Sequence, residues 1–187
     1  MSTNRLTKFA QLATILSLSL AVTVPALADE GSTFKSTDGR MSFWTPSQPK
    51  PTVESLPSQS GSPYKRTTYA VEGRNYLLLA SILDFRGDLP TTGDEVSFLD
   101  TMLESIRRGF GPDFVLDKTQ GTTELKLEAT GWPGRELKGT VQGAVVILRA
   151  YVAPNSIYML QATYEAGDAS VARVGARFLS SFVPGEQ

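Results

Sequence analysis

The chain has 187 residues, with 18 Lys and Arg against 19 Asp and Glu, no His and no Cys, and 41% of its residues are hydrophobic. This composition is typical of a folded protein, and the length favours a single domain. Without His and Cys, imidazole bases, thiolate nucleophiles and zinc sites with nitrogen or sulfur ligands are excluded. The near-neutral charge argues against nucleic-acid binding. We therefore predict a protein that is not an enzyme and that uses no cofactor or metal.

The first 28 residues have the three-part pattern of a secretory signal peptide. Two basic residues precede an apolar run over 12–24, and a small-residue motif ends at Ala28. Because a membrane-spanning helix needs about 20 apolar residues, this run is short for the alternative, an uncleaved anchor. We expect cleavage after Ala28, one α+β domain over 29–187 and no membrane span in the mature protein. The protein would then reside in the periplasm, the thylakoid lumen or the extracellular space.

The start of the mature chain is poor in regular patterns. Residues 29–38 are polar, and we expect them to be irregular before a strand at 40–45. The Pro- and Ser-rich segment 46–63 predicts a loop with a short edge strand at 52–56, or alternatively a disordered linker.

Clear periodicities follow. The turn residues at 72–75 predict a hairpin of strands at 64–71 and 76–85, and the second strand is apolar on both faces, which favours cover on both sides. Apolar residues at spacings of three and four then predict a helix over 93–109, with Thr92 and Glu95 as its capping box.

Strict alternation predicts the next strand, at 124–129, with a return strand at 135–141. The residues Trp132–Arg135 between them fit a type II turn, in which Pro presets one dihedral angle and Gly134 supplies a positive φ.

The remaining elements complete the fold prediction. Strands at 144–153 and 157–164 form another hairpin, and a final helix starts after Asp168. Hairpin connections give an antiparallel sheet, against which both helices bury one face. We predict an α+β fold in α/β/α layers, with 76–85, 144–153 and 157–164 as the central strands.

Three short segments carry a resemblance to a known family: DGRMSFWTP from Asp38, GWPGRE from Gly131 and FLSSF from Phe178. With the element order over residues 34–182, they resemble the α/β/α domains of the PsbP-like family. The resemblance implies an exported, non-enzymatic binding or assembly module with a protein partner. Members exported in photosynthetic organisms associate with photosystem II on the lumenal side. No functional residue carries over from the resemblance.

The predicted turn supplies the candidate site. Trp132, Arg135 and Glu136 form our predicted interaction surface, because Trp and Arg are over-represented among binding hot spots. The alternative is structural: Trp132 folds back to cover the edge of the core, and Arg135 pairs with a nearby acid.

Two other functions remain open at this stage. A carrier for a small apolar ligand would need a cavity between sheet and helix, near Leu103, Ile106 and Phe178. A hydrolase without His would need two facing carboxylates. Its candidates are Asp84, Asp88, Asp94, Glu95 and Asp100.

Local charge patterns give weaker signals. The acidic segment 84–95 has the length of a calcium loop, but Leu89 replaces the glycine that such a loop requires, which favours a solvated loop. The basic pairs 65–66, 107–108 and 173/177 are interpreted as solvated surface; the alternative for Arg173 and Arg177, about one helical turn apart, is contact with an anionic head group or acidic partner.

Overall fold

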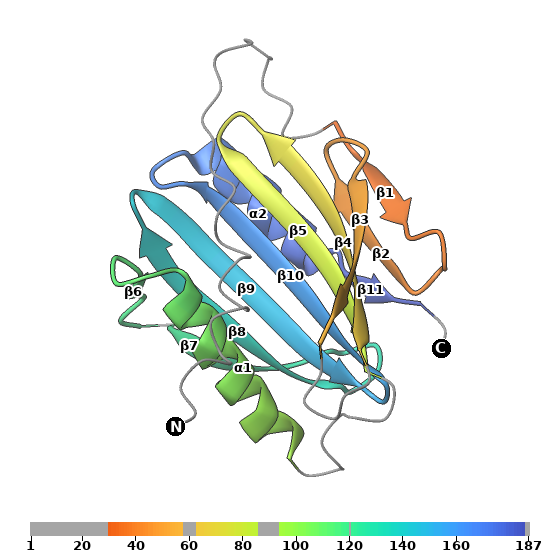
Figure 1. Ribbon diagram of the computed structural model, residues 1–187. Helices are drawn as coiled ribbons and strands as arrows, with labels where there is room; N and C mark the ends of the chain where they lie inside the picture. Colours follow the sequence, from red (N-terminus) through yellow and green to blue (C-terminus); the bar gives the residue numbers. More distant parts are fainter. Residues whose placement is uncertain (1–29, 58–62, 86–93, 120, 186–187) are drawn as a thin grey trace.

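The computed structural model describes residues 30–57, 63–85, 94–119 and 121–185, which form eleven strands and two helices (Figure 1). The strands are β1 (Ser32–Lys35), β2 (Met41–Thr45), β3 (Lys50–Leu56), β4 (Tyr64–Gly73), β5 (Tyr76–Asp84), β6 (Val115–Leu116), β7 (Thr122–Lys126), β8 (Pro133–Val141), β9 (Ala144–Ala153), β10 (Ser156–Glu165) and β11 (Val183–Pro184). The helices are α1 (Glu95–Gly109) and α2 (Ala169–Ser180).

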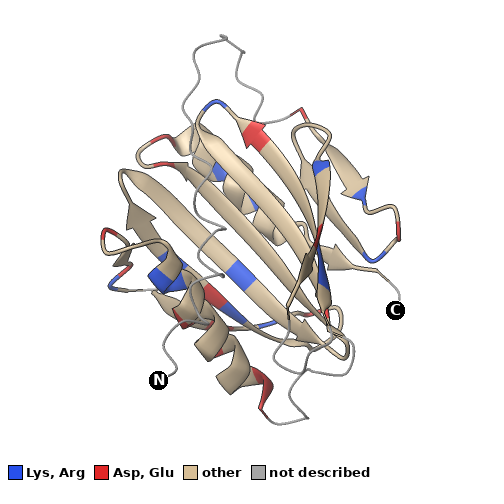
Figure 2. Ribbon diagram, in the orientation of Figure 1, with Lys and Arg blue, Asp and Glu red and all other residues tan. Residues whose placement is uncertain are grey.

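Eight strands form one large sheet in the order β3-β4-β5-β10-β9-β8-β6, and β7 also pairs with β8. All pairings are antiparallel, as the hairpin connections predict. The three strands predicted to be central, now β5, β9 and β10, lie in the middle of the order. Figure 2 shows that charged residues are sparse on these strands and gather on loops and outer elements. The central position of the most apolar strands is therefore confirmed.

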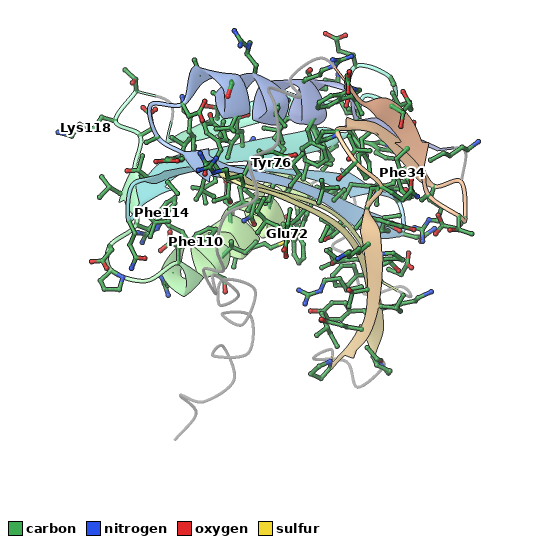
Figure 3. All side chains as sticks on the ribbon, turned by 90° about the horizontal axis from the view of Figure 1, so that it is seen from above. Phe34, Glu72, Tyr76, Phe110, Phe114 and Lys118 are labelled. Carbon is green, nitrogen blue, oxygen red and sulfur yellow. The ribbon has the colours of Figure 1, made fainter. Side chains whose placement is uncertain are left out.

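The two helices lie on opposite faces of the large sheet (Figures 1 and 3). Helix α1 packs against β8 and β9, and α2 packs against β10 and β5. A second sheet, in the order β1-β2-β11, shares the face of α2. The predicted α+β fold is confirmed, but the molecule is richer in sheet than an α/β/α sandwich, because this small sheet supplements the helix on one face.

Side chains alternate along the strands and build two separate cores. The core on the α2 side contains Phe43, Tyr158 and Phe178, whereas the core on the α1 side contains Leu99 and Leu103. Leu103, Ile106 and Phe178 therefore cannot line the single cavity that a carrier function would need, because the sheet stands between Phe178 and the two α1 residues.

The N-terminal part of the described chain is more regular than predicted. Residues 32–35, expected to be irregular, form β1 because they pair with β2 and because Phe34 packs on Phe43 and Tyr69 with ring centroids 5.3 and 5.1 Å away. The edge strand predicted at 52–56 is confirmed as β3 and starts earlier, at Lys50.

The predicted turn at Trp132–Arg135 is wrong. The chain reverses earlier, where the amides of Thr130 and Gly131 donate to the carbonyl of Leu127, and Gly131 has the positive φ, 74°. Gly134 lies inside β8, where a Cβ atom would stand 2.5 Å from Cδ1 of Tyr151. A glycine is required at position 134 because the Tyr151 ring lies so close to the backbone, and not because the chain turns there.

The two described helices begin differently, since the N-cap side chain of α2 accepts hydrogen bonds from the helix amides and that of α1 does not. Asp168 is the N-cap of α2, as predicted, and its carboxylate accepts hydrogen bonds from the amides of Ser170 and Val171 at 2.9 and 3.3 Å. The Ser170 hydroxyl, which donates to the same carboxylate at 2.6 Å, and these two amides hold the pKa of Asp168 below its usual value. Asp94 is the N-cap of α1.

Several predictions fall on residues outside the described ranges. They concern the signal peptide at 1–28, Thr92 of the capping box and Asp88. Neither described helix has the length and apolar character that a membrane crossing requires.

Candidate interaction surface

The three residues predicted to form an interaction surface do not share one face of the sheet. Trp132 is partly buried on the α2 side, where its ring stacks on that of Tyr158 with centroids 5.5 Å apart. Glu136 faces the same side and accepts a hydrogen bond from Arg149 at 2.7 Å. Arg135 faces the α1 side. Contact of any of the three with a partner stays a prediction.

Arg135 is held by acids, as the structural alternative requires. Its Nε donates to Asp100 on α1 at 2.7 Å, and its Nη1 lies 3.2 Å from Glu124 on β7. The hydrogen bond that Arg135 donates to Asp100 raises the pKa of Arg135 above its usual value, although burial opposes the change. Arg135 therefore ties the helix to the sheet.

The described carboxylates among those proposed for hydrolysis are divided between the two faces. Asp84 lies on the α2 side, where it accepts hydrogen bonds from Arg40 and from the hydroxyl of Ser156. Asp100 lies on the α1 side with Arg135. These two groups cannot face one substrate. In the described ranges, no three acids gather closely enough to hold a metal ion.

Most of the predicted basic pairs have local partners. Arg107 and Arg108 both donate to Glu104 at 2.6–2.9 Å, and these hydrogen bonds lower the pKa of Glu104 to about 2. Arg66 pairs with Glu54. The guanidinium of Arg177 lies 4.3 Å from the ring centroid of Trp44, a cation–π contact that joins α2 to the small sheet.

A part of the large sheet on the α1 side has no described element packed over it. Helix α1 covers β8 and β9, and the adjoining parts of β10, β5 and β4 extend beyond it (Figure 3). We call this region the open face. Its six half-buried residues are Thr68, Ala70, Leu77, Leu79, Gln161 and Thr163.

The open face is partly apolar, and two pairs of its polar groups are hydrogen-bonded locally. Gln161 donates from Nε2 to Thr163 at 3.0 Å, and the hydroxyl of Thr68 lies 2.9 Å from that of the buried Ser81. Groups already bonded to each other lose less on leaving water than unpaired groups do. The two leucines gain from doing so. The region is therefore suited to contact with another protein.

The sequence carried a partial signal for the open face. The residues of β5 are apolar on both sides, from which we predicted cover on both sides. That prediction holds for Leu78 and Leu83, which are 1% and 4% exposed. It is wrong for Leu77 and Leu79, which are only half buried because α1 lies over other strands.

The open face ends at β3, the outermost strand of the large sheet. Every residue from Lys50 to Ser55 is exposed, and Val53 is 59% exposed. Among the described strands, β4 is the only one that pairs with β3. The open face and the edge strand β3 are adjacent and together form one continuous surface.

This arrangement, an antiparallel sheet with one helix on each face, is a PsbP-like fold. The solution structure of cyanobacterial PsbP (CyanoP) from Synechocystis sp. matches it with a TM-score of 0.53 at 12% sequence identity, over 90% of this chain and 98% of that chain. No family model and no curated protein matches the sequence. At this identity the likeness shows the fold alone.

Proposed function

We propose that this protein is an exported, non-catalytic binding module that attaches to an extracytoplasmic protein complex through the open face. In a photosynthetic organism, that complex would be photosynthetic, by analogy with its PsbP-like neighbour. The observation that carries the proposal is the half-buried, partly apolar region on β4, β5 and β10. An incompletely covered apolar sheet face gains free energy when a partner covers it.

The chemistry of the described side chains supports binding rather than catalysis. The sequence has no His or Cys, and the acids Asp84, Asp100 and Glu136 are each hydrogen-bonded to an arginine of the fold. These contacts join helices, turns and strands to one another. Their role is to hold the layers together.

A charge placed on the open face tests this function. Thr163→Glu puts a carboxylate on β10 directly beside Leu77 of the open face, and the matched control Thr140→Glu puts one on β8, at an exposed position facing the other side of the sheet. Burying an unpaired charge under a partner is strongly unfavourable. We expect Thr163→Glu to reduce capture of the partner complex from native membranes about tenfold, and Thr140→Glu to leave it unchanged.

Thermal unfolding of both variants provides the folding control, since only variants that melt like the parent protein are compared. Equal capture by Thr163→Glu and the parent would show that the open face is not the binding surface.

A further inference from the structure

The edge strand β3 directs part of its backbone away from the sheet, and Pro51 shows which part. In an antiparallel ladder, directly opposed residues alternate between pairs that exchange two hydrogen bonds and pairs that exchange none. Pro51 opposes Tyr69 and has no N–H, so this pair exchanges none. The amides and carbonyls of Val53 and Ser55, two and four residues further on, therefore point outward.

The side chains of β3 leave this backbone accessible. Residues 50–55 are exposed on both faces of the strand. Val53 is the most exposed of the large hydrophobic residues that the structure describes. A strand added here would form hydrogen bonds to Val53 and Ser55 and would cover the valine side chain.

Charge indicates which kind of strand would be added. Residues 50–56 and their partners 64–70 contain Lys50, Lys65 and Arg66 against Glu54, a local net charge of 3 − 1 = +2. The whole chain has a net charge of −1. On the opposite edge, β7 and its partner segment 133–137 contain two bases and two acids, a net charge of zero. The β3 edge is therefore selectively basic.

We propose that β3 binds an extended, acidic segment of the partner protein by strand addition. This inference rests on the proposed function and names the chemistry of the partner at the end of the open face. Main-chain hydrogen bonds would supply affinity, and the basic side chains would select acidic sequences.

A second copy of the chain fits this edge less well. Pairing β3 with itself would bring two basic edges together, and Pro51 of each copy would interrupt the new ladder. A different protein avoids the repulsion between two basic edges and brings no second proline into the ladder.

A synthetic ten-residue peptide of alternating valine and glutamate is the probe, and its control has lysine in place of glutamate. Hydrogen exchange followed by NMR on the full chain reports on single amides. We expect the acidic peptide to slow exchange at Val53 and Ser55, with binding that weakens as salt is added, and the basic peptide to have no effect. Equal binding of both peptides would overturn the proposal. Slow exchange of these amides without peptide, together with a concentration-dependent dimer in sedimentation, would also overturn it.

A pair of variants separates backbone from side chain. Val53→Pro removes an outward N–H without removing a hydrogen bond to β4, and Val53→Ala keeps the N–H and shortens the side chain. We expect Val53→Pro to weaken binding of the acidic peptide about tenfold more than Val53→Ala does. Equal effects would refute strand addition.

The same variants distinguish the two proposals. If capture of the complex is lost in Thr163→Glu and retained in Val53→Pro, the open face binds the partner and strand addition is wrong. If capture is retained in Thr163→Glu, the proposed function fails, whatever the peptide does.

Discussion

Replacing Trp132 with alanine decides between the two roles predicted for this residue. Its ring is partly buried and stacks on Tyr158, with an angle of 18° between the ring planes. Removing a fully buried Trp costs about 3–5 kcal/mol, and a stacked aromatic pair contributes about 0.5–1.5 kcal/mol of its own. Because Trp132 is only partly buried, we expect a loss of about 2–3 kcal/mol in the free energy of unfolding.

For a protein of this size, such a loss lowers Tm by about 5–10 °C. Urea unfolding followed by circular dichroism measures the loss, and calorimetry measures Tm. Trp132→Phe should retain part of the stability, because a ring remains against Tyr158. Val115→Ala is the matched control at a position that is 58% exposed, and it should leave Tm unchanged. An unchanged Tm in Trp132→Ala, combined with lost capture of the partner complex, would refute the structural role and make Trp132 a binding anchor.

Two further predictions test local chemistry. The Glu104 carboxyl should titrate with a pKa of about 2, measured by NMR, because Arg107 and Arg108 hydrogen-bond to its charged form. Because the pKa of Glu104 is lower in the folded than in the unfolded protein, its ionised carboxylate stabilises the fold at pH values above about 4.5, and this stabilisation is lost as the pH falls towards 2. Titration of Glu104 near 4.5 would contradict the prediction. Gly134→Ala should destabilise the protein by about 1–3 kcal/mol in urea unfolding, because its Cβ would collide with the Tyr151 ring, and an unchanged midpoint would contradict the packing.

Patterns of local origin were predicted well from the sequence. The hairpin of β9 and β10, the start of α2 at Asp168 and the heptad-like apolar spacing of α1 depend on residues close together in the chain. The prediction of the edge strand β3 succeeded for a different reason. A strand that contains proline is tolerated at the edge of a sheet but not at its centre.

The errors concern contacts between distant residues. β1 is polar and short, and its pairing with β2 and the packing of Phe34 on Tyr69 cannot be inferred from either segment alone. The sequence Trp-Pro-Gly-Arg has the residues of a type II turn, but Gly134 is required by Tyr151, a residue 17 positions later. By contrast, the strand predicted at 135–141 already places Arg135 and Glu136 on opposite faces of the sheet, which the predicted interaction surface did not take into account.

The open face itself follows from simple dimensions. Seven neighbouring strands at about 4.8 Å spacing span about 29 Å, whereas a helix with its side chains is about 10–12 Å wide. One helix can therefore cover little more than two strands, and α1 covers β8 and β9. On the other face, α2 is supplemented by β1, β2 and β11, so that Leu78 and Ala80 are almost completely buried. No described element supplements α1 in this way, so β5, the second strand beyond β9 in the sheet order, carries the half-buried leucines. A partner protein that binds there would take the place that the small sheet occupies on the opposite side.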